Sequence, residues 1–271
     1  IAYDVMGRSE NFHLSIVAIR KVFQFPITCN LIDVAITKHG VYQPRAFVIE
    51  PDYLVDVSAI SECFKDYGTQ PLLYLLKKYI PVTTNKHLMI GNIANFFLDE
   101  LMTNPDVTFA QTFPKVFQLN PLAFALLEDR EIKEIQQKSQ KHFTNLKTYV
   151  LRDFKRFDII PKDCFLEPSF FSETYGLQGR LDAFYRGEKS TAIVELKSGK
   201  PWKTNAYGIN NNHFTQTLLY DLIVRSVFED DIEPVNYILY SGKDIEHLKY
   251  APVIKAQQFE ALQIRNLILA I

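Results

Sequence analysis

The chain has 271 residues, a hydrophobic content of 47% and a net charge of −1, which are the values of an ordinary globular protein. These values give no general sign of a polyanion partner, and no apolar run reaches the roughly 18 residues of a membrane span. We therefore expect no membrane partner. The odd, scattered cysteines Cys29, Cys63 and Cys164 suit a reducing compartment, so we expect a cytoplasmic (intracellular) location.

The N-terminal part of the chain alternates between strand and helix patterns. Residues 31–50 are typical of two strands around a turn at His39-Gly40, and residues 53–68 of a strand that leads into a short helix with Ser58 as its N-cap. Helical patterns follow near residues 71–78, 91–102 and 120–156.

The C-terminal part is richer in strands. Strands are expected before Tyr175, over residues 177–185, over residues 192–196 and over residues 235–241. A helix is expected over residues 212–228, and a last helix begins at Lys255. We expect an N-terminal α+β portion over residues 1–87, and a helical connector with an α/β core over residues 88–271. The chain has no initiator methionine, so we expect it to be a piece of a longer one.

A basic helix precedes the strand-rich part. Residues 130–156 carry eight Lys/Arg against three Asp/Glu, and apolar residues recur at helical spacing on the opposite face. A solvated helix surface explains this pattern on its own. A surface that follows a nucleic-acid backbone is the alternative, and only a neighbouring active site would favour it.

Two acids and a lysine interrupt the predicted β-structure. Glu195 and Lys197 follow an apolar run and point to the same face, because they are two residues apart on a strand. Asp182 precedes Glu195 by twelve intervening residues, enough for a turn over residues 186–189 and a return to an adjacent position. Two carboxylates at one edge of a sheet repel each other unless a cation lies between them, and hard oxygen ligands suit Mg²⁺ or Mn²⁺. With Lys197 to orient water or stabilise charge, the pattern predicts phosphodiester hydrolysis. The alternative is an edge strand with a surface Glu–Lys pair.

The ordered motifs carry a family resemblance over roughly residues 88–242. Gly-x-x-Gly-x-x-Asp, Glu-x-Lys and then Gln-x-x-x-Tyr on the next helix resemble the RecB-like branch of the PD-(D/E)XK nuclease superfamily. The strings LEPSFFSETYGLQGRLD and YILYSGK look closest to the nuclease domain of flap-trimming replication helicase–nucleases, and CRISPR-adaptation exonucleases share the motifs. The resemblance implies a restriction-endonuclease-like α/β core: a mixed central sheet flanked by helices, with an N-terminal α+β extension.

The resemblance also assigns roles to residues. Asp182, Glu195 and the carbonyl of Leu196 would bind metal, Lys197 would be the catalytic lysine, and Gln216 and Tyr220 would position the scissile strand or Lys197. For Gln216 and Tyr220 alone, a helix with a polar tip packed on the sheet is the simpler interpretation. Glu167 has a counterpart in the helicase–nucleases but is more simply a solvated carboxylate. His213 and the single tryptophan, Trp202, are secondary candidates: Trp202 could stack on an unpaired base or cover the local core.

The sequence departs from the family pattern in three places, which limits the family properties that can be expected of it. Asn95 stands where the family has a histidine, and we expect it to point toward the metal as a weaker, neutral ligand or, alternatively, to pack within its helix. Three scattered cysteines cannot supply the four thiolates of an iron–sulfur cluster, so we expect none. No Walker motif occurs, so a helicase would be a separate part of the parent chain or a partner.

We expect a metal-dependent nuclease of single-stranded DNA ends or flaps. The alternatives are a silent DNA-binding module that guides a helicase, and RNA as substrate.

Overall fold

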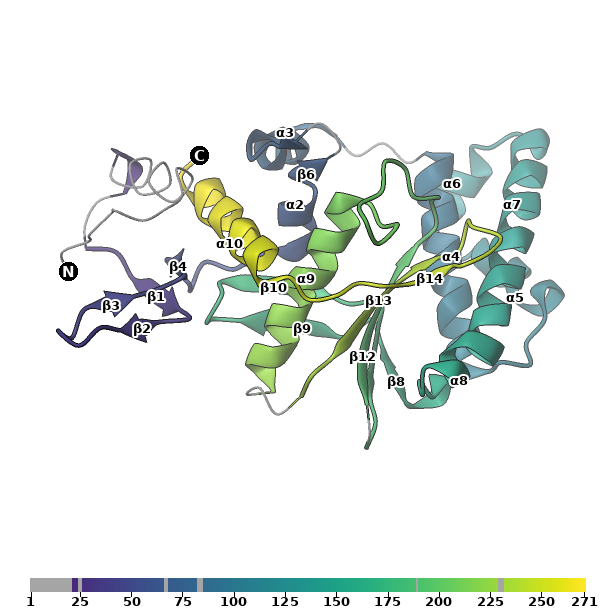
Figure 1. Ribbon diagram of the computed structural model, residues 1–271. Coiled ribbons are helices and arrows are strands. Elements are labelled where there is room, and N and C mark those ends of the chain that lie inside the picture. The colour runs from purple at the N-terminus through teal and green to yellow at the C-terminus, as the bar shows by residue number, and fades with distance from the viewer. Residues whose placement is uncertain (1–20, 24–25, 66–67, 82–84, 189, 229–231) are drawn as a thin grey trace.

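A five-stranded sheet lies at the centre of the molecule, between two groups of helices (Figure 1). The computed structural model describes residues 21–23, 26–65, 68–81, 85–188, 190–228 and 232–271. Helices α4 and α7 cover one face of the sheet, and α9 and α10 lie on the other side. This arrangement follows from β12, whose alternate side chains enter two different hydrophobic clusters.

The central sheet has the order β14-β13-β12-β11-β8 and is mixed. Strands β12 and β13 run parallel, while the other neighbouring pairs are antiparallel. The parallel pair is joined by the crossover helix α9, as parallel strands require. The bounds of the sheet and of its two flanking C-terminal helices are β8 Cys164–Leu166, β11 Ala183–Arg186, β12 Thr191–Lys197, α9 Asn211–Val227, β13 Val235–Tyr240, β14 Leu248–Tyr250 and α10 Lys255–Leu269.

A second sheet of three strands joins the N-terminal part to the core. Strand β5 (Val55–Asp56) pairs in parallel with β10 (Leu177–Arg180), which pairs antiparallel with β9 (Ser169–Ser172). One hydrophobic cluster takes residues from both sides of the predicted boundary at residue 87, from Ile32 and Val57 to Leu219 and Leu262. Residues 26–65 therefore pack on the core and share its hydrophobic interior.

The remaining N-terminal elements are short. Where two strands were expected over residues 31–50, four occur as two antiparallel pairs, β1 with β4 and β2 with β3, and the turn lies at Gly40 as predicted. The predicted N-cap Ser58 is wrong. Asp56 caps α2, because its carboxylate accepts the N–H groups of Ser58 and Ala59. The bounds are β1 Cys29–Ile32, β2 Ala35–Ile36, β3 Tyr42–Gln43, β4 Ala46–Ile49, α2 Val57–Ser61, β6 Phe64–Lys65, β7 Gly68–Thr69 and α3 Leu72–Tyr79.

The helical connector is more broken than its sequence pattern suggests. The helix predicted over residues 120–156 is divided, because Asn120 and Glu128 each begin a new helix as its N-cap. A π-helical turn over Tyr149–Asp153 then interrupts the last part. Helix α5 and strand β14 were not predicted. The bounds are α4 Lys86–Thr103, α5 Phe109–Val116, α6 Pro121–Ala125, α7 Asp129–Thr148, α8 Phe154–Arg156 and a 3₁₀ turn over Pro161–Asp163.

The strand predicted over residues 177–185 is two strands in two different sheets. β10 ends at Arg180 in the three-stranded sheet, and β11 begins at Ala183 in the central sheet. Leu181 and Asp182 form the step between them, which places the Asp182 carboxyl at an edge instead of within a ladder. The predicted return to an adjacent strand is correct, since β11 pairs with β12; Lys189 of the connecting turn lies outside the described residues. Within the described residues no helix is long and apolar enough to cross a membrane.

Candidate active site

Strand β12 separates apolar from ionisable side chains by its alternation. Ala192, Val194 and Leu196 enter the cluster beneath α4 and α7, whereas Ile193 enters the cluster beneath α9. Glu195 and Lys197 continue the Ile193 face by the period of two. The strand therefore turns both ionisable groups toward α9, and Glu195 is only 4% exposed there.

Asp182 meets Glu195 from the neighbouring strand. The pairing of Ala183 with Val194 brings Asp182 beside the C-terminal end of β12, and its Oδ2 accepts the Leu196 N–H at 2.6 Å. Burial raises the pKa of Asp182 well above its ordinary value, and the charge of Glu195 raises it further. A cation beside the two carboxylates would relieve this repulsion.

Lys197 is held as an ammonium ion. Its Nζ donates to Glu195 Oε1 and to Gln216 Oε1, both at 2.8 Å. Burial alone would lower the pKa of Lys197, but the charges of Glu195 and Asp182 outweigh it, so that the pKa lies above its ordinary value. The side chain can therefore offer positive charge and N–H donors, but it is a poor proton acceptor.

Helix α9 supplies the next contacts. Gln216 Nε2 donates to Glu195 Oε1 at 2.8 Å and to the Tyr220 hydroxyl at 3.1 Å, and that hydroxyl donates to the Arg180 carbonyl at 2.8 Å. A Cβ at Gly179 would lie 2.6 Å from the Tyr220 ring, so glycine is needed for the ring to reach this place. The structure therefore places Gln216 in contact with Glu195, and Tyr220 in contact with Gln216 and the Arg180 carbonyl.

The two carboxylate oxygens of Glu195 differ in their hydrogen bonds. Oε1 accepts from both Lys197 and Gln216, whereas Oε2 is buried and has no hydrogen-bond partner within the described part of the chain. An unpartnered buried carboxylate oxygen is costly, and a bound cation would relieve that cost. The donor set fits a hard divalent ion. The set of side-chain donors is limited to two carboxylates. No group of three or more His, Cys, Asp or Glu side chains with metal-binding geometry occurs among the residues that the structure describes.

One face of α4 borders the same edge of the sheet. A Cβ at Gly91 would meet Ser198 Oγ at 3.5 Å, directly after β12, while Asp99, two turns later, lies within electrostatic reach of Glu167 and Arg180. Asn95 is four residues from each and therefore shares their face. The predicted residue Asn95 thus lies on the stretch of α4 that passes this edge, half-buried, and its side chain forms no hydrogen bond with another described residue.

Sequence reasoning missed two acidic residues near the site. Burial raises the pKa of Asp99 to about 6, and the charge of Glu167 adds to this effect. Glu62, from the N-terminal part, accepts from Asn212 at the start of α9 at 3.2 Å and forms ion pairs with Lys65 and Lys77. Burial would raise the pKa of Glu62, but the two lysines lower it to about 2. No motif marks either residue, since each depends on elements distant in sequence.

The raised pKa of Asp99 predicts a stabilising substitution. A carboxyl whose folded pKa lies above its unfolded value contributes stability at low pH that is lost as the pH rises through about 6. We expect Asp99→Asn to raise the free energy of unfolding by about 1–2 kcal/mol near pH 7 and by far less near pH 4. Urea unfolding at both pH values measures this, with the exposed Asp52→Asn as control. An equal effect at both pH values would contradict the assignment.

Two secondary candidates are engaged within the fold. His213 Nδ1 lies 3.0 Å from the Tyr240 hydroxyl, and burial, assisted by the charge of Lys197, lowers its pKa to about 3. The imidazole is therefore neutral and is used to join α9 to β13. Glu167 pairs with Arg180 at 3.1 Å at the surface, and its N–H donates to the Asp182 carbonyl at 3.0 Å.

Three of the eight cationic side chains over residues 130–156 form ion pairs with described residues: Lys138, Lys141 and Arg152. Lys138 pairs with Glu134 at 2.7 Å and Lys141 with Asp244 at 2.6 Å, while Lys147 donates to the Val107 carbonyl at 2.8 Å. The inner face of α7 packs against the core as the periodicity predicts. For Lys138 and Lys141 these contacts agree with a solvated face that carries structural ion pairs, while Arg130, Lys133, Lys155 and Arg156 form no ion pair with a described residue.

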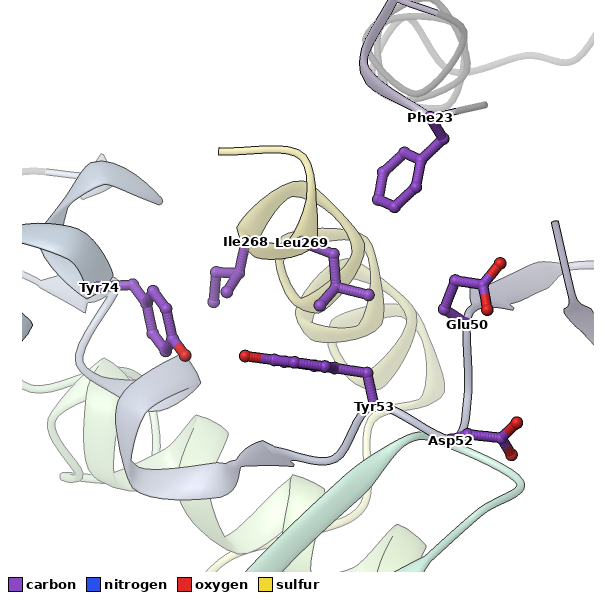
Figure 2. Close-up of a pocket in the computed structure, with 7 residues that line it drawn as sticks. All are labelled: Phe23, Glu50, Asp52, Tyr53, Tyr74, Ile268 and Leu269. Carbon is purple, nitrogen blue, oxygen red and sulfur yellow. The ribbon is translucent and has the colours of Figure 1, made fainter. Parts of the chain in front are cut away.

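A cavity of about 580 Å³ lies apart from the carboxylate cluster. Figure 2 shows Tyr53 below the end of α10, with Ile268 and Leu269 above it and Tyr74 beside it. Phe23, Glu50 and Asp52 complete the lining. Asp182, Glu195 and Lys197 do not line this cavity, so it is distinct from the candidate active site.

Comparison with known proteins bears on the fold. No protein-family model matches the sequence, and no curated protein sequence matches it. The crystal structure of a "Putative exonuclease" from Eubacterium rectale is similar over 80% of this chain and 79% of that chain, with a TM-score of 0.50 and 13% identity. A second solved structure has a TM-score of 0.27 at 12% identity, too low to support an argument. The first likeness and the mixed sheet flanked by helices together confirm the predicted α/β fold class.

Proposed function

We propose that the chain is a metal-dependent DNA nuclease of the RecB-like type that hydrolyses phosphodiester bonds in single-stranded ends or flaps. The observation that carries the proposal is Glu195, whose buried Oε2 is open beside Asp182 while Oε1 is held by Lys197 and Gln216. The similar solved protein is described as a "Putative exonuclease", which agrees with this proposal. A helicase, if one acts with it, would belong to the parent chain or to a partner.

The cation site is small and made of oxygen. Asp182, Glu195 and the Leu196 carbonyl would hold Mg²⁺ or Mn²⁺, and Asn95 would face it from α4. When bound, such an ion lowers the pKa of water and neutralises charge on a phosphate. The raised pKa of Asp182 agrees with this role. Burial and the charge of Glu195 disfavour its carboxylate form, and a bound cation would stabilise that form.

Lys197 would act on the phosphate as a fixed cation. Its ammonium is oriented by Glu195 and Gln216, so it does not have to reorganise when negative charge develops on the phosphoryl oxygens. It can also hold an attacking water through a third N–H donor. Since the ammonium is paired with Glu195, the proton of that water would pass to another group or to the solvent.

Gln216 and Tyr220 would act as positioning residues. Gln216 contacts Lys197, Glu195 and Tyr220 together, so it fixes the relative geometry of the ammonium and the carboxylate. Burial raises the pKa of Tyr220, which stays neutral and donates to the Arg180 carbonyl near Asp182. Loss of either side chain would loosen Lys197 without removing a charge from the site.

A cleavage assay with end-labelled substrates tests the proposal. Single-stranded, duplex and flapped DNA, with matched RNA, would be incubated with Mg²⁺, with Mn²⁺ or with a chelator. We expect products only with metal, and mainly from single-stranded or flapped DNA. Binding without cleavage under every condition would favour the silent DNA-binding module, and cleavage of RNA alone would replace DNA as the substrate.

The proposed place of Asn95 predicts a metal-dependent effect. An amide oxygen is a weaker and harder ligand than imidazole for a transition metal, so metal affinity should be weak and millimolar Mg²⁺ needed. We expect Asn95→His to tighten Mn²⁺ binding by about tenfold in calorimetry. Asn92→His, on the exposed face of α4, is the matched control. Unchanged Mn²⁺ affinity in a folded Asn95→His variant would remove Asn95 from the site.

A further inference from the structure

The loop between β12 and α9 exposes the single tryptophan of the chain. Residues 198–210 follow Lys197 directly and lie between α9 and α4 in Figure 1. Trp202 is 69% exposed in this loop. The side chain therefore does not cover the local core, and most of its aromatic surface is exposed to water.

Hydrogen bonds hold the backbone of the loop. The backbone N–H of Trp202 donates to Asn210 Oδ1 at 2.7 Å, and the backbone N–H of Asn210 donates to the Tyr240 hydroxyl at 3.3 Å. Tyr207 stacks on Phe214 of α9, with ring centroids 5.6 Å apart and planes 16° from parallel. These contacts hold the backbone of the loop, so Trp202 is presented on a preorganised support.

The anchors also place the loop beside the carboxylate cluster. Asn210 is the residue before α9, and Gln216 of the same helix contacts Glu195 and Lys197. At the other end of the loop, Ser198 lies against Gly91 of α4. Both ends of the loop are therefore joined to elements that border the candidate active site.

Positive charge flanks the exposed ring. Lys200 and Lys203 lie two residues before and one residue after Trp202, and neither forms an ion pair with a described residue. Lys138 and Lys141 of α7, by contrast, each form an ion pair. An exposed aromatic ring between lysines is a combination that binds single-stranded nucleic acid, through stacking on bases and contacts to phosphates.

We propose that Trp202 is a base-stacking platform that makes the site select an unpaired strand. The inference rests on the proposed function and adds the residue that distinguishes a single strand from a duplex. In a duplex the faces of the bases are covered by their neighbours in the stack, so only an unpaired or splayed base can lie on the indole. Lys200 and Lys203 would hold the adjacent phosphates without reading sequence.

Intrinsic fluorescence tests the contact directly, because the chain has one tryptophan. The Lys197→Ala protein would be titrated with oligothymidine of about 15 nucleotides, with a duplex of the same length, and with a strand of abasic sugar-phosphates. We expect strong quenching by oligothymidine and little by the other two. Equal quenching by the abasic strand would overturn the proposal, since phosphates alone would then cause the signal.

Substitutions separate stacking from a structural role. We expect Trp202→Ala to weaken single-strand binding about 5- to 100-fold and to raise KM with little change in kcat, and Trp202→Phe to restore most of the affinity. Tyr42→Ala, an exposed aromatic on the distant β3, is the control. Unchanged affinity in Trp202→Ala, or a loss that phenylalanine does not restore, would refute stacking.

The two assays fail independently. Cleavage with wild-type affinity in Trp202→Ala would leave the nuclease intact and remove the platform. Quenching by a single strand without any cleavage by the wild-type protein would keep the platform and contradict the nuclease.

Discussion

Replacement of Lys197 by alanine is expected to abolish metal-dependent cleavage, with a loss of at least about 10²- to 10³-fold in kcat. The ammonium is the positive group nearest to Glu195, and it is oriented by two hydrogen bonds of 2.8 Å. Glu195→Ala should have an equal effect, because it removes the open carboxylate oxygen together with the partner of Lys197 and Gln216. Both losses should appear in kcat measured at saturating DNA and metal.

Binding and folding should survive these substitutions. Glu195 and Lys197 lie on the opposite face of β12 from Val194 and Leu196, which pack in the core, so circular dichroism and single-strand affinity should largely be kept. Lys38→Ala, on the exposed turn between β2 and β3, is the matched control for the loss of a lysine. Wild-type rates in either Lys197→Ala or Glu195→Ala would exclude the proposed mechanism.

The largest effect on stability is expected at Arg265. This side chain of α10 is fully buried and donates to the carbonyls of Ile49, Glu50, Tyr53 and Gly176. Burial lowers its pKa to about 10, so it remains charged in the folded protein near neutral pH. We expect Arg265→Ala to lower the free energy of unfolding by about 3–5 kcal/mol, because several buried carbonyls lose their partner.

Gly176 provides a second test of the same contact. Its φ is +59°, and an added Cβ would collide with the Arg265 guanidinium. Gly176→Ala should therefore destabilise the protein even if Arg265→Ala fails to fold. Urea unfolding of the whole chain measures both, with the exposed Arg130→Ala as control. A change below about 1 kcal/mol in both variants would show that Arg265 does not join the N-terminal part to the core.

Local pattern was sufficient where the chemistry depends on neighbours in sequence. The alternation along β12 is visible in the string AIVELK, and its period of two places Glu195 and Lys197 on one face. The spacing of Gln216 and Tyr220 by one helical turn placed them on one face of α9. The return of β11 beside β12 also followed from the sequence, because a short turn leaves an antiparallel pair few alternatives.

The α/β class and the side chains that share a face can be predicted from local sequence alone, because they depend on periods of two and 3.6 residues. Only the tertiary structure decided the break at Leu181–Asp182, since that break depends on β10 pairing with β5 in a separate sheet. Tertiary contacts likewise decided the raised pKa of Asp99, the pairing of the α7 lysines and the exposure of Trp202. Burial and charge at each of these places come from elements distant in sequence, and no local pattern records them.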